Sequence, residues 1–362
     1  MKMKQLRNHI PIAGPARREP ADGTESPLRV SLGFEPMWYT QRCGVDFSER
    51  WHTDPVYRHA TLVAMKAELH RAFPMVTNWD THRDDDTWTI SGVYGSYFVA
   101  QVFGCELEYA IDRWPQIIRR PDLSLEQLAS LKLADILNAP IVADLFLQID
   151  LIEHNAGKIH GYFSWQGVLN NAFNIYGQDI FTGMIETPEL ARQFFALITD
   201  AMIALARRVQ ARQRASGFAI DQLDVSNCVM NMIAPQMYRE FIFPYDKYIA
   251  TQFEYFGVHT CNWNVNPYLS VLRELPNVGY LDLGIVSDLR RVRELFPNAR
   301  RAVMYSPVKF QDAARDELEN DLRKIRDELA PCDIVMADIQ WTTPDARVNE
   351  LLEICRALEN SV

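Results

Sequence analysis

The stretch GVHTCNWNVNPYLSVLRELPNVGYLDLG, residues 257–284, holds a complete strand–helix–strand unit. Its two ends are short apolar runs typical of buried strands, and residues 267–275 between them have the apolar spacing of a helix. The same alternation extends in both directions. We expect strands at 159–165, 218–225, 257–261, 278–284, 299–306 and 333–338, with helices at 188–214, 235–256, 267–275, 287–296, 310–329 and 343–358. Six such units with strands too apolar to face water predict a parallel sheet covered by helices.

The number of units and the length of 362 residues favour an α/β fold, a single (β/α)8 TIM barrel. We expect the last unit, 333–358, to close the sheet beside the first strand. Residues 1–30 are rich in Pro, Gly, Arg and Glu without periodicity, which predicts a partly mobile N-terminal arm before a barrel domain at 31–362. Further helices are expected at 56–71 and after Ser124, which has Gln127 three residues on as a capping box.

The composition limits the function. A formal charge of −10 argues against nucleic acid and anionic lipid as partners, because both require a basic face. No window approaches 18 uninterrupted apolar residues, and the first residues lack the apolar core of a secretory signal, so a cytoplasmic protein without a membrane span is expected. The 6 cysteines are scattered, which favours free thiols or metal ligands over disulfides. No G-x-G-x-x-G or G-x-x-x-x-G-K-[ST] follows a strand, so a nucleotide-binding sheet is not expected.

In a TIM barrel the chemistry lies at the carboxyl ends of the strands. The polar, aromatic and thiol side chains at these ends are Ser164, Trp165, Asp224, Asn227, Cys228, His259, Cys261, Asp282, Tyr305 and Asp338. We expect Asp224, Asn227 and Tyr305 to contact substrate. Trp38, Tyr39 and Gln41, from the MWYTQ segment, could cover the apolar face of a ligand, although such aromatic residues often only pack a loop.

His259 and Cys261 are two residues apart, so on a strand both side chains would point the same way. Imidazole and thiolate are good zinc ligands, and a catalytic zinc site takes three protein ligands and leaves one position open. Asp338, at the end of the last strand, is the best-placed third ligand, with Cys228 second. Asp282 could hydrogen-bond to His259 from behind. The alternative is that Cys261 is a small buried apolar residue and His259 a hydrogen-bonded core residue.

At this point the chain resembles the uroporphyrinogen decarboxylase family, which includes cobamide-dependent methyltransferases. The resemblance covers nearly the whole chain after the arm. It is carried by EPMWYTQRCG (35–44), FGCELEYAIDRWP (103–115), GVLNNAFNIYGQDIFTGMIETPELARQFFALITD (167–200), NMIAPQMYREFIFPYDKYI (231–249), the opening stretch 257–284 and TTPDARVNELL (342–352). It implies a (β/α)8 barrel with the active site at the strand carboxyl ends.

The resemblance also separates two branches. The decarboxylase branch has arginines that hold substrate carboxylates near position 41, where this chain has Gln41 and Val45, with Arg42 one position off. Since arginine is the residue that binds carboxylate in bidentate fashion, tetrapyrrole decarboxylation is not expected. The methyltransferase branch carries an H-x-C zinc site, which His259 and Cys261 match. That branch also has a glycine after this cysteine, where this chain has Asn262. It has a second cysteine at the end of the last strand, where this chain has Ala337 or Asp338.

We therefore expect a methyltransferase with zinc at His259, Cys261 and Asp338, with Asp282 completing the catalytic residues. It would move a methyl group between a small molecule or thiol and a corrinoid (cobalamin), which a partner protein could deliver. Two alternatives remain open: a metal-free decarboxylase of a less anionic substrate, using Asp224 or Asp282 as the acid, and a non-catalytic cofactor-binding protein. Pairing into a homodimer is also left open.

Overall fold

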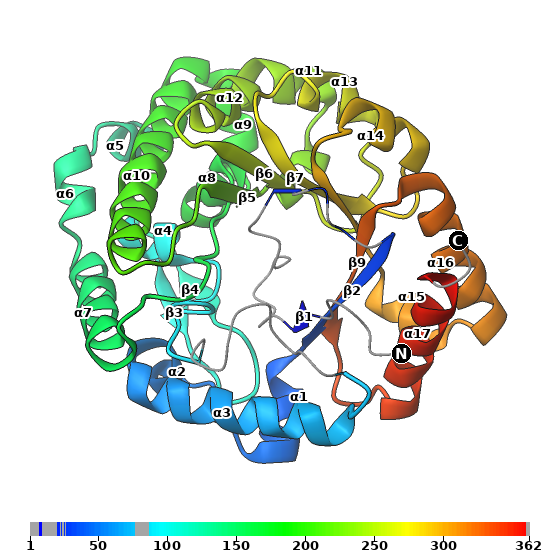
Figure 1. Ribbon diagram of the computed structural model, residues 1–362. Coiled ribbons are helices and arrows are strands. Elements are labelled where there is room, and N and C mark those ends of the chain that lie inside the picture. Colours follow the sequence, from blue (N-terminus) through cyan, green and yellow to red (C-terminus); the bar gives the residue numbers. More distant parts are fainter. Residues whose placement is uncertain are drawn as a thin grey trace.

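The computed structural model describes residues 7–8, 20–21, 23, 25, 27–76 and 87–359. Six parallel strands form most of the barrel wall: β2 (Leu28–Phe34), β5 (Gln222–Ser226), β6 (Tyr255–His259), β7 (Val278–Gly284), β8 (Arg300–Met304) and β9 (Cys332–Ile339). Two isolated parallel bridges join Thr89 to His160 and Gln166 to Ser226. The segment around Thr89 is thus second, and the segment 160–166 third, in the order of the barrel wall between β2 and β5. The strand expected at 159–165 is thus present only as bridges. Together these eight segments make a (β/α)8 barrel, seen along its axis in Figure 1.

The barrel closes between its first and last strands, as the sequence predicts. β9 pairs with β2 in parallel, in a register that sets Leu28 against Cys332 and Leu32 against Met336. On the other edge of β2, the two-residue strand β1 (Arg7–Asn8) pairs in parallel with Ser31 and Leu32. Most of the arm predicted at 1–30 lies outside the described residues. β2 begins at Leu28, within the last residues of this predicted arm.

Helices cover the outside of the wall (Figure 1). The long ones are α3 (Pro55–Ala72), α7 (Pro140–Ala156), α10 (Pro188–Ala215), α16 (Arg315–Leu329) and α17 (Asp345–Glu359). The shorter helical elements are α1 (Pro36–Cys43), α2 (Glu49–Thr53), α4 (Phe98–Val102), α5 (Leu125–Ala129), α6 (Leu133–Leu137), α8 (Val168–Tyr176), α9 (Asp179–Glu186), η1 (Cys228–Met232), α11 (Pro235–Met237), η2 (Tyr238–Ile242), α12 (Phe243–Ala250), η3 (Asn266–Tyr268), α13 (Leu269–Leu272), α14 (Leu289–Leu295) and α15 (Pro307–Asp312). A hairpin of β3 (Glu106–Glu108) and β4 (Gln116–Arg119) is inserted after α4.

Local sequence explains several helix boundaries. Ser124 and Gln127 form the predicted capping box, with both reciprocal hydrogen bonds present. Asp54 caps α3 by accepting from the backbone N–H groups of Val56 and Tyr57. The helix expected at 235–256 is shorter: it ends at Ala250 and contains a π-helical turn, η2.

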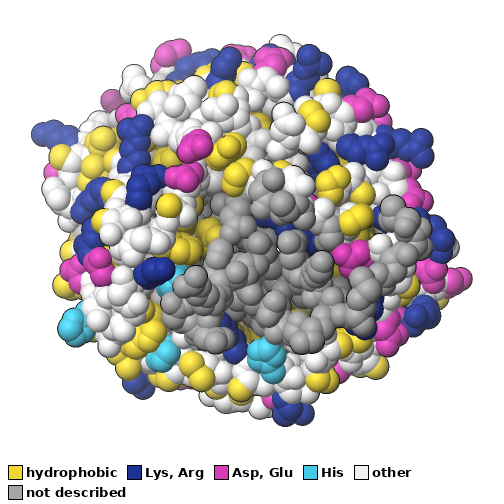
Figure 2. Space-filling view, in the orientation of Figure 1, with side chains coloured by type: hydrophobic (Ala, Val, Ile, Leu, Met, Phe, Trp, Pro, Cys, Tyr) yellow, Lys and Arg dark blue, Asp and Glu magenta, His cyan; other side chains and the backbone are white. Residues whose placement is uncertain are grey.

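Most of the buried apolar side chains form one continuous core. A separate small cluster contains Tyr280 of β7, Ala302 and Met304 of β8, and Val335 and Ala337 of β9. The two residues from β8 are two positions apart, as are the two from β9, so each pair lies on one face of its strand. Figure 2 shows one face of the barrel, where basic and acidic side chains are interspersed around the outer margin. None of the helices in the described part of the chain combines the length and apolar character needed to span a membrane.

Candidate metal centre

Two thiols and one imidazole converge at the carboxyl ends of β5 and β6. Cys228, His259 and Cys261 each offer one ligand atom, and these atoms all lie within 4.8 Å of one another. His259 is buried, while both cysteines are partly exposed. The arrangement therefore gathers three metal-ligating groups at the mouth of the barrel, where the chemistry of this fold takes place.

Strand pairing brings the three residues together. In the ladder between β5 and β6, Ser226 lies opposite His259, and the backbone N–H of Asn227 donates to the His259 carbonyl over 2.8 Å. Cys228 is the next residue along the chain. Cys261 lies two residues beyond the end of β6 with φ of +68°. Strand alternation therefore does not direct its side chain; a left-handed turn does. Such a conformation in a non-glycine residue costs about 1 kcal/mol or more and tends to occur at functional sites.

Asp282 of β7 fixes the orientation of the imidazole. Its Oδ2 lies 2.8 Å from His259 Nδ1, which leaves Nε2 as the ring atom available to a ligand. The same carboxylate accepts from the backbone N–H of Thr260 over 2.9 Å and from the Tyr280 hydroxyl over 3.0 Å. Asp282 is fully buried. The expected hydrogen bond behind His259 is confirmed, and it resembles the carboxylate–histidine pairs that support protein metal sites.

The site favours one thiolate. Hydrogen bonding from Cys228, aided by His259 and opposed by burial, lowers the pKa of Cys261 to about 4. The hydrogen bond to Cys261, together with burial, raises the pKa of the Cys228 thiol. Burial lowers the pKa of His259, but the charges of Asp282 and Cys228 outweigh it and raise that pKa well above its usual value. The group is therefore anionic at one sulfur before any metal binds.

The third member of this group is Cys228, which the sequence ranked behind Asp338. β5 is the direct neighbour of β6, whereas β7 and β8 separate β6 from β9, the strand that carries Asp338. The Asp338 carboxyl group instead shares a hydrogen bond with Glu35, the residue that follows β2. Burial, with the nearby Asp338 charge and this hydrogen bond, raises the pKa of Glu35 to about 8. Asp338 has φ of +60°, a second strained residue at the same mouth.

The other residues expected to contact substrate have side chains that pack in the core or bond to neighbouring residues. Trp38 and Tyr39 are 0% and 1% exposed, and pack with Phe34 inside the core. The Tyr305 hydroxyl donates to Asp321 of α16 over 2.6 Å and is directed outward. The side chains of Asp224, Asn227 and Gln41 are bonded to Gln222, Asp246 and Met37, respectively.

Sequence reasoning missed Glu35, Thr260 and Tyr280. Glu35 was detectable, because it follows the first strand directly and the rule of strand carboxyl ends applies to it. Tyr280 lies two residues before Asp282 on β7, so the same-face spacing of a strand links them. No sequence signal distinguishes the backbone N–H of Thr260.

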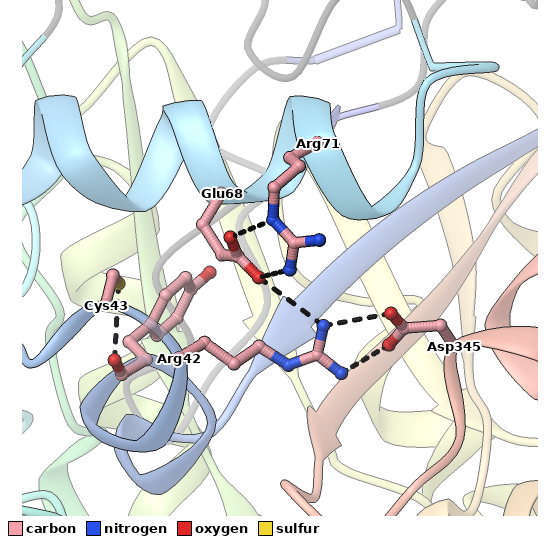
Figure 3. Close-up of polar contacts among 6 residues, drawn as sticks. Arg42, Cys43, Glu68, Arg71 and Asp345 are labelled. Carbon is pink, nitrogen blue, oxygen red and sulfur yellow. Dashed lines mark hydrogen bonds and ion pairs between the residues drawn. The ribbon is translucent and has the colours of Figure 1, made fainter.

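Arg42 does not extend toward the mouth. It forms a bidentate pair with Asp345 of α17, at 2.9 and 2.5 Å, and lies 3.5 Å from Glu68 of α3 (Figure 3). Glu68 is also bound by Arg71, and the Arg42 guanidinium lies 4.1 Å from the Trp38 ring centroid. The one arginine near the expected carboxylate-binding segment is therefore committed to joining the first and last helices.

This ion pair gives a stability prediction. Because Arg42 and Asp345 are partly exposed, their coupling energy in a double-mutant cycle of Arg42→Met and Asp345→Asn should be about 1 kcal/mol. Chemical denaturation of the four proteins measures it. The pair Arg323–Glu319, exposed on a single helix, is the matched control and should couple more weakly. Equal coupling in the two pairs would contradict a role in barrel closure.

The sulfur atoms give a second prediction. Mild hydrogen peroxide should convert the Cys228 and Cys261 thiols of metal-free protein into a disulfide, with two molecules of water as the other product. Peptide mapping without reduction detects the link. A Cys43→Ser variant should form it equally well, since Cys43 is partly exposed but lies outside the group. Recovery of both thiols unlinked would show that the sulfurs are farther apart than described.

Comparisons with known proteins place the chain in a family. The family model for uroporphyrinogen decarboxylase (URO-D) matches residues 92–289, more than half of the chain. The chain belongs to this family. No curated protein matches the sequence.

Solved structures share the fold. A methyltransferase from Methanosarcina mazei is 16% identical, with a TM-score of 0.63, and 95% of each chain is covered. A B12-independent methionine synthase from Shewanella sp. W3-18-1, in complex with selenomethionine, is 10% identical with a TM-score of 0.42, covering 87% of this chain and 95% of that one. The first of these likenesses confirms the barrel.

Proposed function

We propose that the protein is a zinc-dependent methyltransferase that exchanges a methyl group between a small molecule or thiol and a corrinoid. The observation that carries the proposal is the group of Cys228, His259 and Cys261 within 4.8 Å, with Asp282 behind the imidazole. The proposal replaces Asp338 with Cys228 as the third ligand. It rests on family membership for the reaction type and on the donor set for the metal.

The donor set fits zinc. Two thiolate sulfurs and one imidazole nitrogen are soft and borderline ligands of the kind zinc prefers, and three protein ligands leave a fourth position for substrate. When bound there, zinc would act as a Lewis acid that holds a thiol as thiolate or polarises a methyl donor. The low pKa of Cys261 agrees with a site prepared for a cation.

The chain's own residues have separate roles in this proposal. Cys228 and Cys261 supply negative charge, and Asp282 holds the tautomer and orientation of His259. Glu35 keeps a proton near neutral pH, and its carboxyl group donates it to the hydrogen bond with Asp338. The charges of Cys261 and His259 act on the pKa of Asp338, so this acid pair lies near the ligand group. A proton that enters or leaves the substrate heteroatom thus has a carboxyl group nearby.

The corrinoid and its carrier are part of the proposal. A corrinoid supplies or accepts the methyl group, and the protein orients the other substrate against it. A small corrinoid-binding protein that docks over the mouth would deliver it. The test uses free methylcobalamin with zinc-loaded protein and a panel of small thiols. Loss of the methylcobalamin absorbance that requires protein, zinc and thiol together supports the proposal, whereas equal loss without protein contradicts it.

Family membership leaves one competing function, decarboxylation. Uroporphyrinogen carries eight carboxylates, while Gln41 and Val45 occupy the expected arginine positions and Arg42 is held by Asp345. We therefore expect no conversion of uroporphyrinogen to coproporphyrinogen at ordinary turnover, on the order of 1 s⁻¹. Product analysis under anaerobic conditions measures this, with an authentic decarboxylase as the positive control. Conversion at that rate would reject the methyltransferase assignment.

A further inference from the structure

A buried carboxylate that forms no ion pair with the described residues is linked to the metal centre through one asparagine. Asp246 of α12 is fully buried, and its Oδ2 accepts from the Tyr238 hydroxyl over 2.7 Å and from Asn227 Nδ2 over 2.8 Å. Its Oδ1 has no hydrogen-bond partner among the described residues. Burying a carboxylate without a counter-ion costs stability. This cost is explained if Asp246 holds another residue in place.

Asn227 is the residue through which Asp246 reaches the centre. Its side chain is 1% exposed and donates to Asp246, while its backbone N–H donates to the His259 carbonyl. A Cβ atom at Gly167 would lie 1.8 Å from Asn227 Oδ1, so the amide packs closely against the Gly167 backbone. Asn227 is thus fixed from three directions, and Cys228 is the next residue.

Tyr238 completes the support from the other side. It is fully buried and begins the π-helical turn η2, which runs to Ile242 just before α12. π-helical turns are rare and are frequent at functional sites. Tyr238 and Asp246 are eight residues apart in the sequence, and the π-helical turn lies between them. The Tyr238 hydroxyl nevertheless reaches the carboxylate.

We propose that Asp246 is a positioning residue that, together with Tyr238, holds Asn227 and thereby keeps Cys228 within ligand distance of His259 and Cys261. The inference rests on the proposed metal site but concerns a residue outside it. Asp246 contacts none of the three ligand residues through any hydrogen bond found in the described part of the chain. Its effect passes through the Asn227 side chain to the backbone of residues 227–228.

The test compares Asp246→Leu with Asp246→Asn. Leucine has the same number and branching of side-chain heavy atoms but accepts no hydrogen bond, so Asn227 loses its anchor. An asparagine oxygen at the position of Oδ2 can still accept from both Tyr238 and Asn227. We expect Asp246→Leu to weaken zinc binding about 10–100-fold in competition with a chromogenic chelator. Asp246→Asn should remain within about threefold of the wild type, and Tyr238→Phe should fall between them.

Two further readouts distinguish positioning from general destabilisation. In cobalt(II)-substituted protein, the thiolate-to-cobalt absorption of Asp246→Leu should fall, because Cys228 is displaced. In metal-free protein, peroxide should link Cys228 to Cys261 more slowly in this variant than in the wild type. Ile325→Ala is the control: Ile325 is fully buried on α16, and its truncation lowers stability without touching the centre.

The outcomes separate the two claims. Normal zinc affinity, normal cobalt absorption and a normal linking rate in Asp246→Leu would overturn the positioning role and leave the metal site intact. Zinc binding by none of the proteins would reject the proposed function, and the linking rate would then decide the positioning role alone. If Asp246→Leu does not fold, Tyr238→Phe decides by the same three measurements, and wild-type behaviour in it would overturn the inference.

Discussion

Replacing Cys228 with serine should lower the zinc affinity of the protein on the order of 100-fold or more, because the site loses one of two thiolate ligands. Cys261→Ser and His259→Ala should have effects of similar size, since all three ligand atoms lie within 4.8 Å. Asp282→Asn should have a smaller effect, about 10-fold, because it disturbs only the orientation and basicity of the imidazole. Competition with a chelator of known zinc affinity measures each value.

The control for this series is Asp338→Asn. Asp338 was the third ligand expected from the sequence, but its carboxyl group is bonded to Glu35. We expect its replacement to change zinc affinity by less than about threefold, against the 10-fold or more that a ligand or its direct support contributes. A large loss in Asp338→Asn, with wild-type affinity in Cys228→Ser, would restore the ligand set predicted from the sequence.

Replacing Glu35 with glutamine should remove a pH-dependent loss of stability. Burial and Asp338 raise the pKa of Glu35 from 4.5 to about 8, so the folded protein keeps this proton where the unfolded chain has released it. The stabilisation is therefore complete below pH 4.5 and is lost as the pH rises through about 8. At about 1.4 kcal/mol for each pKa unit, the expected loss is on the order of 5 kcal/mol.

Unfolding by urea between pH 5 and 9 measures this effect. The difference in unfolding free energy between Glu35→Gln and the wild type should grow with pH in favour of the variant and level off above about pH 8. Glu68→Gln is the control: the hydrogen bond and ion pair with Arg71 lower the pKa of Glu68 below 4.5, so the difference between this variant and the wild type should not change between pH 5 and 9. A constant difference between Glu35→Gln and the wild type across this range would mean that Glu35 is ionised at neutral pH in the folded protein.

Much of the fold follows from the sequence. Apolar runs and helical periodicity predict β5 to β9, which are five of the six parallel strands of the barrel wall, and the helices between them. Buried parallel strands and amphipathic helices leave clear patterns in a sequence. The closure of β9 on β2 follows from chirality and the number of units. The segments around Thr89 and His160 are the exception: a strand is predicted at 159–165, but the structure pairs His160 with Thr89 and Gln166 with Ser226 only through single bridges.

The candidate site was predictable only in part. His259, Cys261 and Asp282 follow from strand ends and spacing, but Cys261 faces the group through a left-handed turn and not through strand alternation. The choice between Cys228 and Asp338 depends on which strand neighbours β6, which requires the three-dimensional sheet order. The aromatic residues near strand ends were predicted at the site but lie elsewhere. Trp38 and Tyr39 are packed in the core, and Tyr305 bonds to a helix. Local sequence does not indicate the direction in which such a side chain points.

X-ray absorption at the zinc edge tests the central claim most directly. For wild-type protein loaded with one equivalent of zinc, the account predicts two sulfur neighbours at about 2.3 Å and nitrogen or oxygen neighbours at about 2.0–2.1 Å. Cys228→Ser and Cys261→Ser should each reduce the sulfur shell to one neighbour, and Asp338→Asn should leave it unchanged. A wild-type spectrum with one sulfur, or with nitrogen and oxygen alone, would contradict zinc binding by Cys228, His259 and Cys261.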